Sequence, residues 1–201
     1  MQIQESNWQV INATTPAQIF HALRRQVHRE FRKPLIVVSP KMLLRYKRAT
    51  SKLEDFGPDA TFQRLIGEVD ERVLKRPDEK IRKLVFCVGK VYYHLTDERE
   101  EKEKFDVAIV RIEQITPFPF DQVAEQIAKY PNAELVFCQE EPKNMGTWYF
   151  VDDRIFTATR VLLGEGKRCE YVGRKTMASP AVGYGAVHAK EQHNIVTRAL
   201  E

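Results

Sequence analysis

The first forty residues alternate between short apolar runs and a stretch with helical periodicity. Residues 8–11 read as a short strand, and Thr15 followed by Pro16 suits the cap and first turn of a helix. The next apolar residues recur at the spacing of one buried helical stripe: Ile19, Phe20, Leu23, Val27 and Phe31. Pro34 ends this helix, and residues 35–38 form an unbroken apolar run typical of a strand buried on both faces. The pattern predicts a βαβ unit.

Residues 41–79 interrupt this regular pattern. A short basic helix is expected within residues 41–52, and Gly57, Pro58 and Asp59 break the chain after it. A second polar break follows at residues 76–80. We therefore place a domain boundary or a long connection within residues 41–79.

Beyond residue 83 the apolar runs and helical stretches alternate regularly. Four strands are expected, at residues 84–88, 107–112, 134–138 and 168–172. Helices are expected after each of them, the last over residues 188–200, which follows a stretch rich in Ser, Pro and Gly. Strands that alternate with helices indicate a mostly parallel sheet covered on both faces, because each crossover lays a helix on the sheet. The predicted fold class is α/β, a three-layer αβα arrangement preceded by the βαβ unit.

Composition and cysteine use narrow the class of protein. The chain has 201 residues, of which 43% are hydrophobic and 30% are charged, as in soluble globular proteins. No apolar run is long enough to span a bilayer, and the first residues lack the pattern of a signal peptide. The cysteines, three in number, have no metal-like spacing. Cys87 and Cys138 lie inside apolar runs, so we expect buried free thiols and a reducing compartment.

The net charge of +4 hides an asymmetry along the chain. Residues 1–53 contain ten Lys and Arg against two Asp and Glu, a balance of +8. Residues 54–201 contain 22 against 26, a balance of −4. The basic quarter suits phosphates or an acidic partner, and it suits equally the solvated face of a helix.

Two short motifs follow predicted strands, where ligands bind in open α/β sheets. Glu140 and Glu141 are neighbours on a strand, so their side chains point to opposite faces and do not form an acid–base pair. We expect one of them to cap a helix or to pair with a basic residue. Gly89 and Lys90 predict a tight strand-to-helix turn, because a lone glycine does not build a phosphate-binding loop.

Other common sites find no support in the sequence. The histidines are not spaced like zinc ligands, and no serine lies in a nucleophile elbow. An aromatic residue among basic ones, at residues 45–48, is a weak signal for nucleic acid, which we do not expect as a partner. The residues alone therefore indicate no self-contained catalytic or metal site.

Several ordered motifs extend along nearly the whole chain and carry a resemblance to a known family. In sequence they read TPA at residues 15–17, FHALRRQ at 20–26, KPLIV at 33–37, SPKMLLR at 39–45, GKVYY at 89–93, DVAIVRIEQ at 106–114, PFP at 117–119, QEEP at 139–142 and YVGR at 171–174. Together they resemble the C-terminal part of the thiamine-diphosphate-dependent first component of the 2-oxoglutarate dehydrogenase complex.

This resemblance implies that the chain is a segment of a longer enzyme. Residues 1–45 look like the closing βαβ of a thiamine pyrimidine-binding domain, and residues 80–201 look like a transketolase-type C-terminal domain. The family's thiamine diphosphate and magnesium ligands and its catalytic residues lie in upstream segments. We therefore expect no catalytic, cofactor-binding or metal-binding residue here.

The resemblance also implies a function. Such an enzyme oxidatively decarboxylates 2-oxoglutarate in the tricarboxylic acid cycle and transfers the succinyl group to a lipoyl-bearing succinyltransferase component. The segment itself would support a homodimer and partner docking, and would be inactive alone. The amino-acid sequence at residues 28–33 and 144–146 resembles that of eukaryotic members, which are mitochondrial. This resemblance implies that the protein is located in the mitochondrial matrix. A 2-oxoadipate dehydrogenase segment and a stand-alone adaptor that binds an acidic partner remain alternatives.

One branch of the family binds an acyl-CoA effector in this region through basic residues. Arg25 and Gln114 match that pattern and are the candidate effector-binding residues. Phe120, Asp121 and Gln122 stand where that branch has arginines. A phosphate-rich ligand would lack those charges here.

Overall fold

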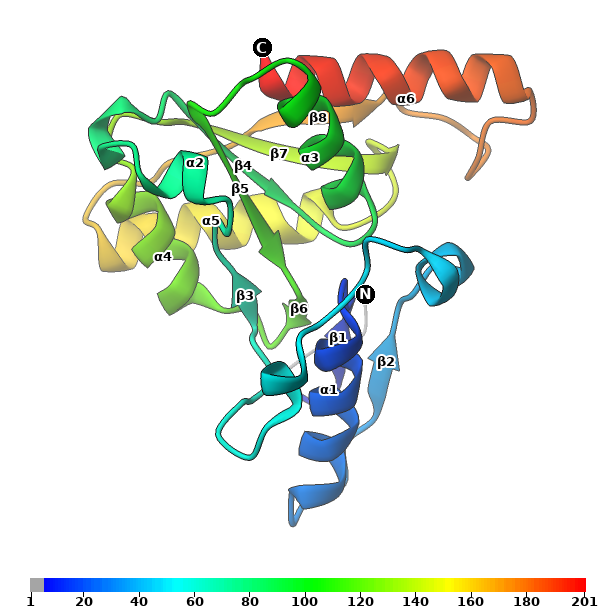
Figure 1. The fold of residues 1–201 in the computed structure, drawn as a ribbon, viewed down its shortest axis with the longest axis vertical. Coiled ribbons are helices and arrows are strands. Elements are labelled where there is room, and N and C mark those ends of the chain that lie inside the picture. Colours follow the sequence, from blue (N-terminus) through cyan, green and yellow to red (C-terminus); the bar gives the residue numbers. More distant parts are fainter. Residues whose placement is uncertain (1–5) are drawn as a thin grey trace.

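A computed structural model describes residues 6–201 and contains two sheets (Figure 1). The smaller sheet has the order β2-β1-β6. It is built from β1 (Gln9–Ile11), β2 (Leu35–Val37) and β6 (Gln114–Thr116). Strand β1 pairs in parallel with β2 and antiparallel with β6. The helix α1 (Pro16–His28) connects β1 to β2, so the predicted βαβ unit is confirmed.

Local signals at the start of α1 act as expected. Thr15 is the N-cap, and its hydroxyl accepts a hydrogen bond from the Gln18 amide at 3.4 Å. Pro16 occupies the first turn, where its missing N–H costs nothing. The helix ends at His28, six residues before Pro34, so the expected end of this helix lies too far along the chain.

The connection between the two units is mostly irregular. Residues 41–80 contain the short 3₁₀ helices η1 (Lys41–Arg45), η2 (Leu53–Phe56) and η3 (Asp78–Lys80), the strand β3 (Leu65–Ile66) and the one-turn helix α2 (Glu71–Leu74). The basic helix expected over residues 41–52 is therefore reduced to η1.

The larger sheet has five strands in the order β3-β5-β4-β7-β8. Its parallel strands are β4 (Lys83–Cys87), β5 (Val107–Ile112), β7 (Glu134–Pro142) and β8 (Glu170–Arg174). Strand β3 joins the edge antiparallel to β5. Every residue of β4 and β5 is buried, as continuous apolar runs in a parallel sheet predict.

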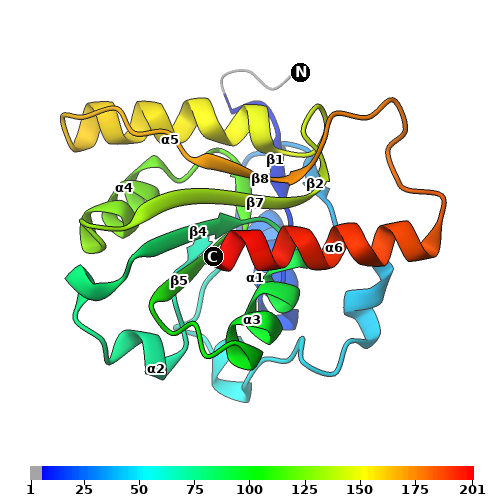
Figure 2. The same cartoon turned by 90° about the horizontal axis from the view of Figure 1, so that it is seen from above.

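Helices cover both faces of this sheet (Figure 2). On one face lie α3 (Val91–Glu101) and α6 (Gly185–Leu200), whose apolar residues pack on alternate strand positions such as Val85 and Val136. On the other lie α4 (Phe120–Lys129) and α5 (Trp148–Leu162), which cover Phe86 and Phe137. The α/β fold class with three αβα layers is confirmed.

One segment belongs to both sheets. Strand β5 in the large sheet is followed by a single residue, Glu113, and then by β6 in the small sheet. The Glu113 carbonyl accepts the amide of Asn12 at 2.9 Å, directly after β1. The two units are thus joined by shared backbone pairing as well as by the connection.

The expected buried stripe of α1 is wrong for this structure. Phe20, Leu23 and Val27 are 42%, 55% and 77% exposed. The helix instead buries its opposite side, which carries Ala17, Gln18, His21 and Ala22. The physical reason is that, within residues 6–201, this face is covered only in part, by the contact of Phe20 with Phe56 of η2, whereas Leu23 and Val27 remain largely exposed.

Strand β2 also departs from the expectation of a strand buried on both faces. It lies at the edge of the small sheet, and Ile36 and Val37 are 43% and 39% exposed. Among the residues that the structure describes, no helix is long and apolar enough to cross a membrane.

Candidate effector pocket and its surroundings

A pocket of about 510 Å³ lies beside α1, where the helix faces the loop before β3. Its lining combines two arginines and two histidines with a small apolar wall, and includes His21, Arg24, Arg25, His28, Pro58, Thr61 and Phe62. None of these lining residues is acidic. The pocket therefore favours an anion, and its guanidinium groups suit phosphate or carboxylate.

Arg25 is the half-buried cation of this pocket. Its guanidinium lies over the Phe62 ring at 4.2 Å from the ring centre, and its Nη2 atom is buried without a hydrogen-bond partner. Burial and the neighbouring charges of Arg29 and Arg64 lower the pKa of Arg25 to about 10. The group stays charged at neutral pH, and an anion would relieve both the desolvation and the repulsion.

Arg24 and His21 hold the pocket together. The Arg24 guanidinium donates to the carbonyls of Gly57 and Ala60, which ties α1 to the loop. The His21 Nε2 atom lies 2.6 Å from the Asp55 carbonyl, so that nitrogen carries the proton. These two side chains are engaged within the fold, which leaves Arg25 as the cation most available to a ligand.

Gln114, the second sequence candidate, lies on β6 and does not line this pocket. It is 4% exposed, and its Nε2 atom donates to the Pro117 carbonyl at 2.7 Å. Its backbone amide donates to the Arg64 carbonyl at 2.9 Å. Arg64 in turn forms a 2.6 Å ion pair with Asp121, which lowers the pKa of the Asp121 carboxyl. Gln114 is thus linked to the region around Arg25 only indirectly, through its backbone hydrogen bond to Arg64.

A buried polar cluster at the junction of the sheets was missed by sequence reasoning. The fully buried Glu113 carboxylate accepts bonds from the Thr14 amide at 2.9 Å and the Thr14 hydroxyl at 2.5 Å. The Arg111 guanidinium donates to that hydroxyl at 3.0 Å and lies 3.9 Å from the centre of the Tyr92 ring. Burial raises the pKa of Glu113, and the charge of Arg111 opposes this only in part. The signal available in the sequence was the presence of charged residues, Arg111 and Glu113, within or directly after an apolar strand.

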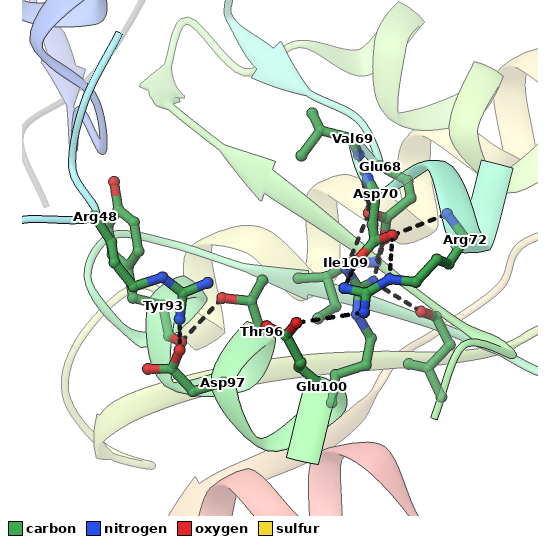
Figure 3. A network of polar contacts seen from close by, with 12 residues as sticks. Arg48, Glu68, Val69, Asp70, Arg72, Tyr93, Thr96, Asp97, Glu100 and Ile109 are labelled. Carbon is green, nitrogen blue, oxygen red and sulfur yellow. Dashed lines mark hydrogen bonds and ion pairs between the residues drawn. The ribbon is translucent and has the colours of Figure 1, made fainter. Parts of the chain in front are cut away.

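A second buried network joins the connection to the large sheet (Figure 3). The side chains of Arg99 and Glu68 form an ion pair in which each is 2% exposed. The Glu68 carboxylate also accepts the Ile109 amide at 2.8 Å. Asp70 accepts from Arg72 at 2.8 Å, and chiefly this bond lowers the pKa of Asp70. The network anchors an irregular segment that has little apolar surface of its own.

The two motifs at strand ends are brought together. The Lys90 Nζ atom lies 2.7 Å from the Glu140 Oε1 atom, so the expected pairing of one glutamate with a basic residue is confirmed. Gly89 has a φ of +74°, and a Cβ atom there would lie 2.5 Å from the Asn12 side chain. The tight turn is therefore confirmed, and only glycine fits it.

The cysteines and histidines form no obvious reactive centre. Cys87 and Cys138 are buried free thiols, as expected, and Cys169 is buried as well; burial raises the pKa of each. Within residues 6–201, no group of three or more His, Cys, Asp or Glu is arranged to hold a metal ion.

The fold places the chain among transketolase-like α/β proteins. A solved structure described as "Split gene transketolase, inactive beta4 tetramer" matches 96% of this chain and 57% of its own, with a TM-score of 0.56 and 17% identity. Residues 50–200 match the family model "2-oxoglutarate dehydrogenase C-terminal", and residues 4–47 match "Transketolase, pyrimidine binding domain". The chain belongs to the 2-oxoglutarate dehydrogenase C-terminal family.

Similar curated proteins agree with this assignment. The "2-oxoglutarate dehydrogenase, mitochondrial" of Dictyostelium discoideum is 47% identical over 99% of this chain and 19% of its own length. The "2-oxoglutarate dehydrogenase E1 component" of Brucella anthropi is 45% identical over 98% of this chain and 20% of its own length. The chain spans about a fifth of the length of these relatives.

Proposed function

We propose that the chain acts as the C-terminal part of a 2-oxoglutarate dehydrogenase. The observation that supports this is similarity along the whole chain to about one fifth of enzymes of that name. In the proposal, the complete enzyme decarboxylates 2-oxoglutarate and passes the succinyl group to a lipoyl-bearing succinyltransferase. Residues outside this chain hold its thiamine diphosphate and magnesium, and it works as a homodimer in the mitochondrial matrix.

In the same proposal this segment has a structural role. Residues 1–45 close a pyrimidine-binding domain, residues 46–79 connect, and residues 80–201 form a C-terminal domain that supports the dimer and partner docking. The exposed apolar residues of α1 and β2 support the first assignment, because the remaining strands and helices of a larger domain would cover them.

Enzyme assays with two substrates test this role. The purified 201-residue chain with thiamine diphosphate and magnesium is expected to show no decarboxylation of 2-oxoglutarate or 2-oxoadipate. An enzyme of the relatives' length that carries this segment should turn over 2-oxoglutarate. Preference for 2-oxoadipate would favour the alternative substrate, and turnover by the short chain would refute the structural role.

An adaptor function is the second candidate, and the basic first quarter of the chain favours it. An immunoblot of source-organism extract, with an antibody against residues 80–201, separates the two. A band several times larger than the chain's mass supports the dehydrogenase segment. A band at the chain's own mass supports the adaptor.

We also propose that the pocket beside α1 binds an anionic effector through Arg25. Its basic lining and the unpartnered Nη2 atom of Arg25 support this. Gln114 acts as a positioning residue, because its amide holds the Arg64 carbonyl next to the pocket.

Calorimetric titration with acetyl-CoA tests the pocket. Arg25→Gln is expected to weaken binding about ten- to hundredfold, since one charge-assisted bond contributes about 1.5–3 kcal/mol. Arg160→Gln, on the exposed part of α5, is the matched control and should leave affinity unchanged. Equal affinities for wild type and Arg25→Gln would reject Arg25 as the contact.

A further inference from the structure

The last helix packs on the large sheet over only part of its length. The buried residues of α6 are Ile195, Val196, Ala199 and Leu200. Residues 185–190 are all exposed, and this part of the helix reaches past the ends of β7 and β8 (Figures 1 and 2). The first half of α6 therefore gains little from the burial of apolar surface, which supplies most of the stability of helices in proteins.

The start of α6 also lacks local stabilisation. Tyr184 is the N-cap residue, and its side chain makes no capping hydrogen bond to the first turn. Gly183 and Gly185 lie on either side of it, with open space around both. Because an uncapped first turn leaves its amides without partners and glycine lowers helix stability, the first half of α6 requires contacts with the rest of the chain to stay helical.

Arg174, at the end of β8, provides these contacts. It is 7% exposed, and its carbonyl accepts the Tyr171 hydroxyl at 2.8 Å. Its guanidinium donates to the Glu191 carboxylate at 2.9 Å and to the Gln192 side chain at 3.2 Å, and it lies 3.3 Å from the His188 Nδ1 atom. The three partners lie on one face of the helix, because they are three and four residues apart. One buried side chain thus holds two turns of α6 against the sheet.

The segment that contains these partners is fixed at both ends. Before it, the Asn144 side chain donates to the Met177 carbonyl at 2.9 Å and accepts the Met177 amide at 3.1 Å. After it, the Thr197 hydroxyl donates to the Glu98 carboxylate of α3 at 3.0 Å. Movement of the intervening segment would therefore leave both of these anchors in place.

We propose that residues 178–192 form a strap that opens and closes over the carboxyl ends of β7 and β8, with Arg174 as the residue that holds it closed. In the open state residues 185–192 unwind, while the packed end of α6 stays on the sheet. Opening uncovers a cavity of about 200 Å³ whose lining includes Glu140, Arg174 and His188. Ligands of open α/β sheets bind at the carboxyl ends of the strands, so the strap controls access to this edge.

The strap lies within the 201-residue chain, so it is tested on that chain and independently of any enzymatic activity. Amide hydrogen exchange followed by NMR measures opening residue by residue. In the wild type, residues 189–192 should exchange faster than residues 197–200, and the amides of β4 should exchange most slowly. Arg174→Met should speed exchange at residues 189–192 about ten- to hundredfold, because charge-assisted hydrogen bonds are lost, and should change β4 much less.

Variants on the helix side test the same contact without altering a buried residue. Glu191→Gln removes the charged partner of Arg174 and should speed exchange at residues 189–192 by less than Arg174→Met does. Lys190→Gln, at the exposed position next to it, is the matched control and should exchange as the wild type does. Tyr184→Ser supplies a capping hydroxyl and should slow exchange in the same residues about fivefold.

Three results would overturn the proposal. Equal protection of residues 189–192 and 197–200 in the wild type would show that α6 does not open in part. Wild-type exchange in both Arg174→Met and Glu191→Gln would show that Arg174 does not hold the strap closed. Acceleration of β4 by the same factor as residues 189–192 would show that Arg174 stabilises the whole fold and not the strap.

Discussion

The same kind of apolar pattern has opposite outcomes in the two units of this molecule. In the large sheet, the apolar runs that become β4 and β5 are buried at every residue. In the small sheet, the stripe on α1 and the run that becomes β2 remain largely exposed. Periodicity thus indicates which face of an element is made for burial. Whether that face is buried depends on surfaces elsewhere, and residues 6–201 supply them for only one unit.

The junction between the two units differs from both, because polar contacts and not apolar packing hold it together. It is held by polar groups, with the Glu113 carboxylate bonded to Thr14 and Gln18 across the two sheets. The contribution of such contacts to stability depends on their geometry and charge, whereas the contribution of the apolar core depends on the apolar area that is buried. Each part of the molecule should therefore respond differently to mutation and to pH.

The largest expected loss of stability comes from the buried ion pair. Arg99→Met leaves Glu68 buried without its cation and should lower the free energy of unfolding by about 3–5 kcal/mol. Arg72→Met, which removes a half-exposed arginine from the same network, should cost much less, because exposed ion pairs contribute little. Urea unfolding followed by circular dichroism measures both. Similar losses in the two variants would show that the pair at Arg99 is not desolvated.

A matched pair of leucines tests the comparison of the units directly. Leu84 in β4 is fully buried and Leu23 in α1 is 55% exposed. Leu84→Ala should cost about 2–5 kcal/mol. Leu23→Ala should change stability by only about 0.5 kcal/mol, as surface substitutions do. A large loss from Leu23→Ala would mean that α1 is covered in solution, for example by a second copy of the chain.

Self-association should depend on the exposed face of α1. Leu23→Lys combined with Val27→Lys is expected to reduce association of the 201-residue chain, because the apolar stripe is replaced by charge. Lys substitutions at Val161 and Leu162, exposed on α5, provide the control. Sedimentation velocity measures the outcome. A monodisperse wild-type monomer would contradict this prediction.

The smallest effect concerns pH. The pKa of Glu113 is raised by burial, so its contribution to stability is full below the unfolded pKa and is lost as pH rises through the folded value. The side chain of Glu113→Gln does not titrate. The stability of this variant relative to that of the wild type should therefore be higher at pH 7 than at pH 4. Thermal unfolding at both values detects this as a shift of about 2–4 °C per kcal/mol. An unchanged difference between the two pH values would exclude a titrating Glu113.

Much of this fold could be predicted from the sequence, and the misses have identifiable causes. The strand over residues 107–112 was predicted with its observed bounds, because an apolar run interrupted only by Arg111 leaves few alternatives. Strand β6 was missed since three residues after a strand look like its continuation. Its role as a strand of the other sheet depends on pairing with β1, about one hundred residues earlier.

The candidate site was less predictable than the fold. Arg25 and Gln114 were chosen from a resemblance, and only Arg25 lines the pocket. The sequence predicted that one of the two glutamates pairs with a basic residue. It did not identify Glu140 and Lys90 as the pair, because sequence gives no measure of distance between strand ends. The buried charges at Glu113 and Arg99 were missed because residue type alone predicts exposure for them.

The crossing of one segment between the two sheets has a consequence for synthesis. Strand β1 leaves the ribosome about one hundred residues before β6, the strand that completes its sheet. At about 5–20 residues per second, the nascent β1 edge waits roughly 5–20 s for that partner. During this interval β1 has an unpaired edge on the side opposite β2, and it is then that a chaperone would have most to protect.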